Sequence, residues 1–189
     1  MQITEQQHKA SQKIVELVAA KIGKNRAVHS ATAISSCARL SGSFLFRSFN
    51  FQLANVSPGN AVLSDEANEK GHVLINFIGG MLNNLGVNIN GEELEEQPAE
   101  ESNLSFLDTL KLLQDKAAEI MIENKLDYEQ IAYSCAVATA FVIKECQNDL
   151  AVQSGFNTAI YSFIEGSKTY PPEFPKLGSK KKSFFNFWK

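Results

Sequence analysis

The chain has 189 residues, of which 44% are hydrophobic and 21% are charged, and its formal net charge is −3. An apolar share of this size is ordinary for a globular protein and excludes wholesale disorder. The net negative charge excludes nucleic-acid binding through bulk electrostatics. The length suits one hydrophobic core, so we expect a single domain over residues 1–166 and a Pro-punctuated tail over residues 167–189.

An uncharged stretch, IAYSCAVATAFVI, runs from Ile131 to Ile143. A transmembrane helix needs about 20 such residues, so this shorter run predicts a core helix rather than a membrane span. Asp127 and Gln130 have the spacing of a capping box and mark the start of the helix. The sequence therefore predicts an all-α fold, a single helical bundle of five or six helices with a largely uncharged central helix.

Capping residues and apolar repeats at helical spacing predict the other helices of the bundle. We expect them over residues 4–23, 26–48, 65–85, from 105 to about 124, and 149–166, with one long helix through Asn148–Asp149 as the alternative to a break there. The expected N-terminal caps are Thr4, Asn25, Ser64, Ser105 and Asp149. The short connection Lys125–Leu126 predicts that the helices on either side of it pack as an antiparallel hairpin.

The helix predicted over residues 26–48 is rich in small residues. These are Ala31, Ala33, Ser35, Ser36, Ala38, Ser41, Gly42 and Ser43. Small residues allow a neighbouring helix to approach closely. We therefore expect this face to be buried between other helices or to form the interface of a homodimer.

Two arginines, Arg39 and Arg47, lie on the same half of this helix. Each needs a partner, because burial of an unpaired guanidinium group costs several kcal/mol. Asp65, Glu66 and Glu69 are the expected partners in a structural ion pair. The alternative is that Arg39 and Arg47 bind an anionic ligand.

Two further features of the sequence bear on packing and on charge. Gly79 and Gly80 interrupt the helix predicted over residues 65–85, where each costs about 1 kcal/mol relative to alanine, so we expect close packing or a kink there. Residues 87–102 form an acidic loop inside the domain. Its glutamates are Glu92, Glu93, Glu95, Glu96, Glu100 and Glu101, and such runs are usually solvated.

Cysteine and histidine patterns indicate structural rather than chemical roles. Cys37, Cys135 and Cys146 lie in helical patterns without CxxC spacing, which predicts buried, reduced thiols. The N-terminal residues lack the pattern of a signal peptide, so we expect a cytoplasmic location. The pairs Glu5–His8 and Glu69–His72 have the Glu-x-x-His spacing of di-iron bundles. Both lie near the first turn of a helix among polar neighbours, so we predict neither a metal nor a cofactor.

Motifs that would fix a reaction are absent from the sequence. It contains no phosphate-binding glycine loop, nucleophile elbow or zinc-ligand spacing. We therefore name no catalytic residue. A non-enzymatic role is favoured, and an enzyme without a short motif is left open.

The C-terminal stretch KLGSKKKSFFNFWK carries five lysines and no acidic residue. Lysines are attracted to anionic headgroups, and aromatic rings favour the membrane–water interface. The predicted partner-binding or membrane-binding residues are Lys180, Lys181, Lys182, Phe184, Phe185, Phe187 and Trp188. Other hypotheses are that the tail fills a partner's groove, that it lies against the acidic loop of the same chain, or that it only solubilises the protein.

The sequence thus predicts a non-enzymatic protein–protein interaction or adaptor protein. Its expected partners are another protein, a second copy of the chain, and an anionic membrane surface at the inner face of the membrane. The alternative is a bundle that binds or transforms a small anionic molecule through Arg39 and Arg47.

Overall fold

The structure, a computed structural model, describes residues 2–23, 28–89 and 97–174. Its helices are α1 (Glu5–Ile22), α2 (Ser30–Ser48), α3 (Asp65–Asn84), α5 (Phe106–Glu123), α6 (Tyr128–Glu145) and α7 (Val152–Ser167). The all-α bundle of five or six helices is confirmed. Across the three described ranges, no helix is both long enough and apolar enough to pass through a lipid bilayer.

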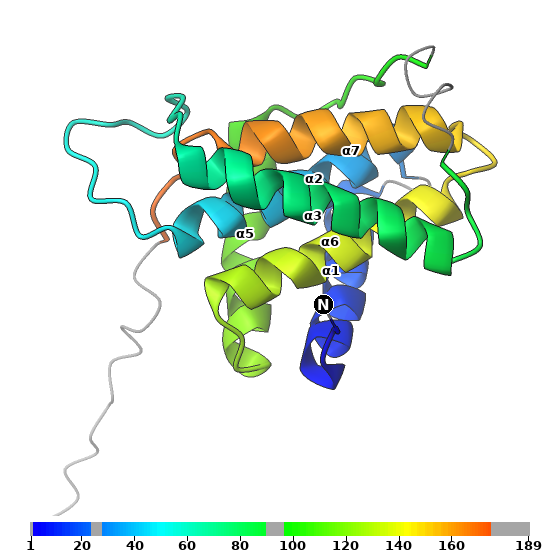
Figure 1. Cartoon of the computed structure of the whole chain (residues 1–189), viewed down its shortest axis with the longest axis horizontal. Helices are drawn as coiled ribbons and strands as arrows, with labels where there is room; N and C mark the ends of the chain where they lie inside the picture. The colour runs from blue at the N-terminus through cyan, green and yellow to red at the C-terminus, as the bar shows by residue number, and fades with distance from the viewer. Residues whose placement is uncertain (1, 24–27, 90–96, 175–189) are drawn as a thin grey trace, which may run out of the picture.

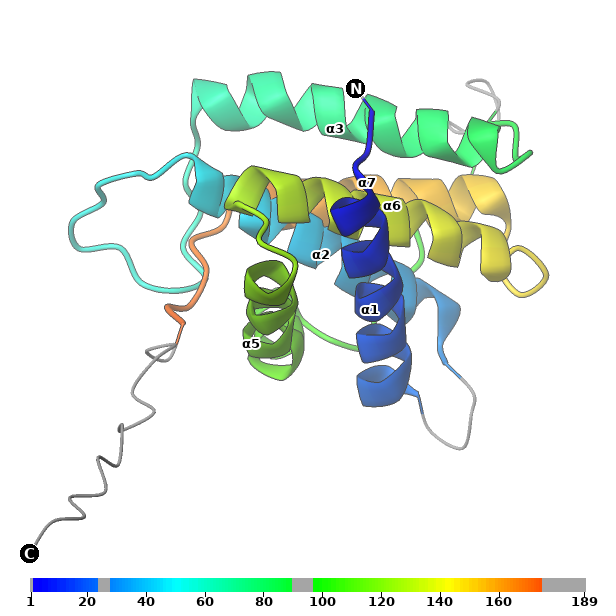
Figure 2. The same cartoon turned by 90° about the horizontal axis from the view of Figure 1, so that it is seen from below.

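The helices are arranged in two directions. In Figures 1 and 2, α2, α3, α6 and α7 run roughly along the long axis of the molecule, and α1 and α5 cross them steeply. α2 contacts each of the other helices, and α6 contacts α1, α2, α3 and α7. The small-residue helix α2 and the largely uncharged helix α6 therefore form the centre of the bundle.

α6 has the buried surface that its sequence predicts. Asp127 caps it through the predicted box, because the amide of Gln130 donates to the Asp127 carboxylate and the amide of Asp127 donates to the Gln130 side-chain oxygen. Ala136 and Ala138 are fully buried. The exception is Phe141, which is 41% exposed although it belongs to the uncharged stretch, as the third residue from its C-terminal end.

The small residues of α2 let α7 approach closely. A β-carbon added to Gly42 would lie 2.6 Å from the amide nitrogen of Ser167, and one added to Gly166 would lie 2.6 Å from the carbonyl oxygen of Arg39. On the α6 side, the Ser41 hydroxyl donates to the carbonyl of Ala132 at 2.8 Å. Burial between helices is confirmed. Because α6 and α7 already cover this face, it is not available to a second copy, and a homodimer would need another surface.

The predicted caps hold at most helix starts. Thr4, Ser64 and Ser105 each accept a hydrogen bond from the first turn of the helix that follows. The start predicted for α2 at residue 26 is wrong, because α2 begins at Ser30 and the ring of His29 caps it. The proposed cap Asn25 lies outside the described residues.

The start predicted for α7 is also wrong. This helix begins at Val152, and the residue before it, Ala151, makes no side-chain capping bond. Asp149 lies in the turn after α6, where its amide donates to the carbonyl of Cys146. The connection between α6 and α7 is therefore longer than the one predicted.

The predicted hairpin between α5 and α6 is wrong. The chain turns a corner at Lys125, whose φ of 55° lies in the left-handed region, and α6 leaves in a different direction from α5 (Figure 2). α5 packs on α1 and α2 instead. The reason is the apolar stripe of Leu110, Leu113 and Ala117, which is fully buried on that side.

α3 runs without interruption through Gly79 and Gly80. A β-carbon at Gly79 would lie 3.6 Å from the ring of Phe156, which is an ordinary contact, and one at Gly80 would meet nothing within 4 Å. The close packing predicted for these glycines is therefore absent at Gly80.

The chain after α7 packs back onto the bundle, and we call residues 168–174 the C-terminal strap. Ala61 and Thr169 form an isolated antiparallel bridge. The amide of Val62 donates to the carbonyl of Lys168 at 2.7 Å, and the amide of Tyr170 donates to the carbonyl of Asn60 at 2.8 Å. The C-terminal strap thus contacts the rest of the described structure beyond residue 166, the end that the sequence predicts for the domain.

Candidate functional site

Arg39 of α2 is 8% exposed and lies among hydrogen-bond acceptors. Its Nε donates to the carboxylate of Glu165 on α7 at 2.7 Å. Its Nη1 donates to the hydroxyls of Thr109 (3.2 Å) and Ser102 (3.3 Å) and to the carbonyl of Leu104. Charge-assisted bonds of this kind are the strongest in proteins. Arg39 therefore ties α2 to α7, to α5 and to the segment before α5.

The predicted partners of Arg39 are wrong. Asp65, Glu66 and Glu69 lie at the start of α3, whereas α7 covers this part of α2. The true partner, Glu165, lies 126 residues from Arg39 along the chain. No local spacing in the sequence identifies it.

Arg47 near the end of α2 binds the C-terminal strap. Its Nη2 donates to the carbonyl of Pro172 at 2.6 Å and to the side-chain oxygen of Gln114 at 3.0 Å. Its guanidinium carbon lies 4.0 Å from the centroid of the Phe174 ring, a cation–π contact. Burial lowers the pKa of Arg47 to about 10, because a desolvated cation is disfavoured. The partners of Arg47 also differ from those predicted.

The two arginines do not come together in one site. Arg39 lines a cavity of about 680 Å³ whose wall also carries Glu100, Glu101 and Glu165, and these carboxylates oppose an anion. Arg47 lies against the strap. Among the residues that the structure describes, the two guanidinium groups share no hydrogen-bond acceptor.

The end of the strap is fixed to the core by Phe174. Its ring stacks on Phe44 and Tyr128, with centroid separations of 6.3 and 6.5 Å, and Arg47 covers it. Phe44 itself is only 1% exposed. Phe174, the last described residue, is therefore held at a defined point beside Tyr128, the first residue of α6.

The predicted binding residues of the tail follow this point and lie outside the described residues. They are Lys180, Lys181, Lys182, Phe184, Phe185, Phe187 and Trp188. Part of the acidic loop, Glu92, Glu93, Glu95 and Glu96, lies outside the described residues as well. Their roles remain predictions.

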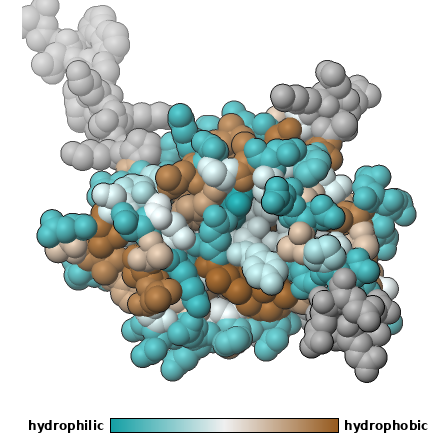
Figure 3. All heavy atoms as spheres, turned by 90° about the horizontal axis from the view of Figure 1, so that it is seen from above, coloured by the Kyte–Doolittle hydropathy of each residue, from teal (hydrophilic) through white to brown (hydrophobic). Residues whose placement is uncertain are grey.

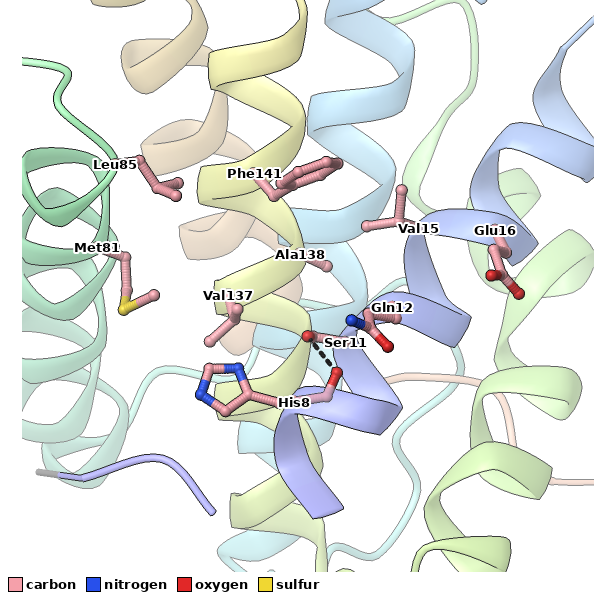
Figure 4. Close-up of a pocket in the computed structure, with 10 residues that line it drawn as sticks. All are labelled: His8, Ser11, Gln12, Val15, Glu16, Met81, Leu85, Val137, Ala138 and Phe141. Atoms are coloured by element: carbon pink, nitrogen blue, oxygen red, sulfur yellow. Dashed lines mark hydrogen bonds between the residues drawn. The ribbon is translucent and has the colours of Figure 1, made fainter. Parts of the chain in front are cut away.

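An apolar groove between α1, α3 and α6 was not predicted from the sequence. It has a volume of about 410 Å³, within the range of small-molecule and peptide pockets. In Figure 4, α6 forms its floor, with α3 on one side and α1 on the other. The lining residues are Val137, Ala138 and Phe141 from α6, Met81 and Leu85 from α3, and His8, Ser11, Gln12, Val15 and Glu16 from α1.

The rim of this groove carries one carboxylate. Glu16 is exposed, and it forms no ion pair within the described part of the chain. The Ser11 hydroxyl is satisfied, because it donates to the backbone carbonyl of His8 at 2.8 Å, the dashed line in Figure 4. The groove thus combines an apolar floor with an unpaired negative charge, a surface suited to an apolar segment that carries positive charge.

Exposed apolar residues also lie outside the groove. Figure 3 shows apolar residues among polar ones on the face that it views. Leu63 and Tyr161 are 81% and 67% exposed. Single exposed apolar side chains are normal on protein surfaces, so the groove is the better candidate for a binding site.

The cysteines are placed as a structural role requires. Cys37 and Cys135 are fully buried and Cys146 is partly buried, and all three are free thiols. Burial raises the pKa of Cys37 to about 12 and also raises the pKa of Cys135. Both thiols are therefore protonated and unreactive at neutral pH.

The Glu-x-x-His pairs are not gathered into a metal centre. Glu5 instead forms an ion pair with Lys9 at 2.6 Å. Within residues 2–23, 28–89 and 97–174, no group of three or more His, Cys, Asp or Glu side chains could hold a metal ion.

Comparison of the chain with protein-family models, with curated proteins and with solved structures found no match.

Proposed function

We propose that this protein is a non-enzymatic interaction or adaptor protein that attaches to the anionic inner face of a membrane through its C-terminal tail. The supporting observation is the clamp on Phe174, whose ring stacks on Phe44 and Tyr128 under the guanidinium group of Arg47. A tether needs a firm attachment to the body that it holds. The clamp supplies this attachment two residues before the first lysine of the C-terminal stretch and ten residues before its first aromatic residue.

The chemistry of the tail supports the same role. Each lysine near an anionic membrane surface contributes about 1 kcal/mol, and aromatic rings add affinity for the interface. One membrane-binding feature alone gives only marginal, reversible binding, and stable attachment needs two. The tail combines two such features, a run of lysines and a cluster of aromatic side chains, which suits peripheral attachment. The helical bundle would then be presented to a protein partner in the cytoplasm.

The anion-binding alternative has less support. Arg39 already donates to Glu165, Ser102, Leu104 and Thr109. A ligand at Arg39 would have to displace these acceptors and approach the glutamates around it.

Co-sedimentation with vesicles tests membrane attachment. The full chain, a chain that ends at residue 175, and a variant with Lys180, Lys181 and Lys182 changed to Gln are mixed with vesicles of phosphatidylcholine alone or with added phosphatidylserine. The full chain should sediment only with the anionic vesicles. The triple substitution should weaken this binding on the order of a hundredfold, and the truncated chain should stay in solution.

The matched control changes lysines outside the tail. A variant with Lys9, Lys13 and Lys70 changed to Gln loses the same charge, but these lysines form ion pairs on the bundle surface. It should bind the vesicles much more strongly than the tail variant does. Equal sedimentation of the full and truncated chains would refute the proposal.

A further inference from the structure

We infer that the aromatic end of the chain, residues 183–189 (SFFNFWK), docks into the apolar groove between α1, α3 and α6 of the same molecule. The inference rests on the proposed function, because it takes the tail as the binding element. It adds a closed state in which the bundle withholds the aromatic residues from the membrane.

The groove is an apolar surface that no helix in the described part of the chain covers. Phe141 is 41% exposed, whereas Ala138 and Ala140 on the same helix are fully buried and Val142 is 8% exposed. Figure 4 shows Val137, Ala138 and Phe141 along the floor between α1 and α3. Aromatic side chains are enriched in the cores of protein interfaces, and the end of the tail supplies Phe184, Phe185, Phe187 and Trp188.

The tail is long enough to reach the groove. It starts at Phe174, whose ring lies 6.5 Å from that of Tyr128 at the start of α6. Phe141 lies further along the same helix, about 20 Å away at 1.5 Å per residue. An extended chain spans about 33 Å from Phe174 to Phe184 and about 46 Å from Phe174 to Trp188. The difference leaves slack for the chain to pass over the surface of the bundle.

The charges of the two surfaces are complementary. Glu16 at the groove rim forms no ion pair with any described residue. The tail carries five lysines and no acidic residue between Lys176 and Lys189. A lysine beside the aromatic cluster can pair with Glu16, and such a contact at the rim orients the segment while the rings occupy the floor.

Trp188 reports directly on docking, because it is the only tryptophan in the chain. The emission maximum and acrylamide quenching of the full chain are compared with those of a synthetic peptide of residues 176–189. Docking predicts a blue-shifted emission and a quenching constant several-fold below that of the peptide, independent of protein concentration. Quenching equal to that of the peptide would overturn the inference. Protection that appears only as concentration rises would assign the groove to the tail of a second copy and would also overturn it.

Variants locate the docking site. Phe141→Asp places a charge on the groove floor at a position that is already half open to water, and Glu16→Lys reverses the charge of the rim. Phe141→Asp should raise the quenching constant to that of the peptide, and Glu16→Lys should raise it part of the way. Tyr161→Asp on α7, at a residue 67% exposed outside the groove, should leave it unchanged. If protection persists in folded Phe141→Asp and Glu16→Lys proteins, the tail docks elsewhere.

Vesicle binding separates this inference from the proposed function. Membrane attachment is tested with the free peptide of residues 176–189, which has no groove. Suppose that the peptide binds anionic vesicles and that Trp188 is protected in the full chain. Only molecules with an undocked tail can then bind, so the full chain binds more weakly than the peptide. Phe141→Asp should lower the apparent dissociation constant for vesicles by a factor equal to one divided by the fraction of wild-type molecules whose tail is undocked. If the peptide does not bind, the proposed function fails, while the quenching data still decide on docking. If the peptide binds but Trp188 of the full chain is unprotected, only the docking inference fails.

Discussion

Gly42 of α2 and Gly166 of α7 each lie against the backbone of the other helix. A β-carbon on Gly42 would lie 2.6 Å from the amide nitrogen of Ser167, and one on Gly166 would lie 2.6 Å from the carbonyl oxygen of Arg39. Backbone atoms of packed helices cannot move aside individually. The two glycines therefore set the spacing of α2 and α7, and with it the position of Glu165 beside Arg39.

We expect Gly42→Ala and Gly166→Ala each to destabilise the protein by about 2–3 kcal/mol. The added methyl group forces α2 and α7 apart, which is the usual cost of overpacking a well-packed core. Urea unfolding followed by circular dichroism measures the change in the free energy of unfolding.

Gly80→Ala is the matched control for these substitutions. Gly80 is an exposed position within α3, and an added β-carbon meets nothing within 4 Å. Alanine should stabilise the protein here by about 1 kcal/mol, because glycine is the poorer helix former. Equal effects at Gly80 and Gly42 would contradict the close approach of α2 and α7.

Replacement of Arg39 by Met should destabilise the protein by about 3 kcal/mol. The substitution keeps much of the apolar volume but leaves Glu165 and the other acceptors of Arg39 without their donor. Glu165→Gln should cost less than about 1 kcal/mol, because the Glu165 side chain is 41% exposed and the amide oxygen can still accept from Arg39. Thermal or urea unfolding gives both values, and an Arg39→Met protein as stable as the wild type would show that the bonds contribute little.

Replacement of Arg47 by Met should loosen the C-terminal strap without unfolding the bundle. Arg47 supplies a charge-assisted bond to Pro172 and the cation–π contact to Phe174, and a bond to a charged donor contributes about 1.5–3 kcal/mol. Amide hydrogen exchange at Val62 and Tyr170 should therefore accelerate about 10- to 100-fold. Amide exchange in α6 should stay unchanged in Arg47→Met. In a Lys70→Met control, exchange should stay unchanged at Val62, at Tyr170 and in α6. Unchanged exchange at Val62 and Tyr170 would show that other contacts hold the strap.

Cys37 should make stability fall as the pH becomes alkaline. Burial raises the pKa of the folded-state thiol from 9.0 to about 12. Between these values the unfolded chain releases the proton and the folded chain keeps it, so the stabilisation present below pH 9 is lost as the pH rises. From about pH 8 to about pH 10, the wild type should lose about 1.4 kcal/mol more than Cys37→Ala. A Cys146→Ala control should change the slope less, because Cys146 is only partly buried, and identical slopes for wild type and Cys37→Ala would contradict the burial of the thiol.

Features that depend on neighbours in sequence could be predicted. The capping box of Asp127 and Gln130, the caps Thr4 and Ser64, and the buried character of α6 follow from residues within one or two helical turns. These local rules gave the fold class and most of the helix starts.

Features that depend on distant segments could not be predicted. Glu165 reaches Arg39 only because α7 packs closely on the small residues of α2. Phe174 reaches Phe44 only because the C-terminal strap folds back onto the bundle. The corner at Lys125 was missed since the length of a connection does not fix the direction in which the next helix leaves. The apolar groove was missed because it depends on how far apart α1 and α3 lie on α6. Phe141 belongs to the uncharged stretch that predicts a core helix, so nothing in the sequence marks this residue as exposed.

The attachment of Phe174 to the core also sets the length of the tether. Because Phe174 is fixed, the chain from it to Phe184 is only ten residues long, and a short linker keeps its end at an effective concentration in the millimolar range. At such a local concentration, a groove that binds the free peptide with a dissociation constant of ~100 μM would be about nine-tenths occupied in the intact chain. A membrane or a partner must then outcompete a ligand that never diffuses away, so the threshold for attachment is set by the spacing between the clamp and the aromatic residues.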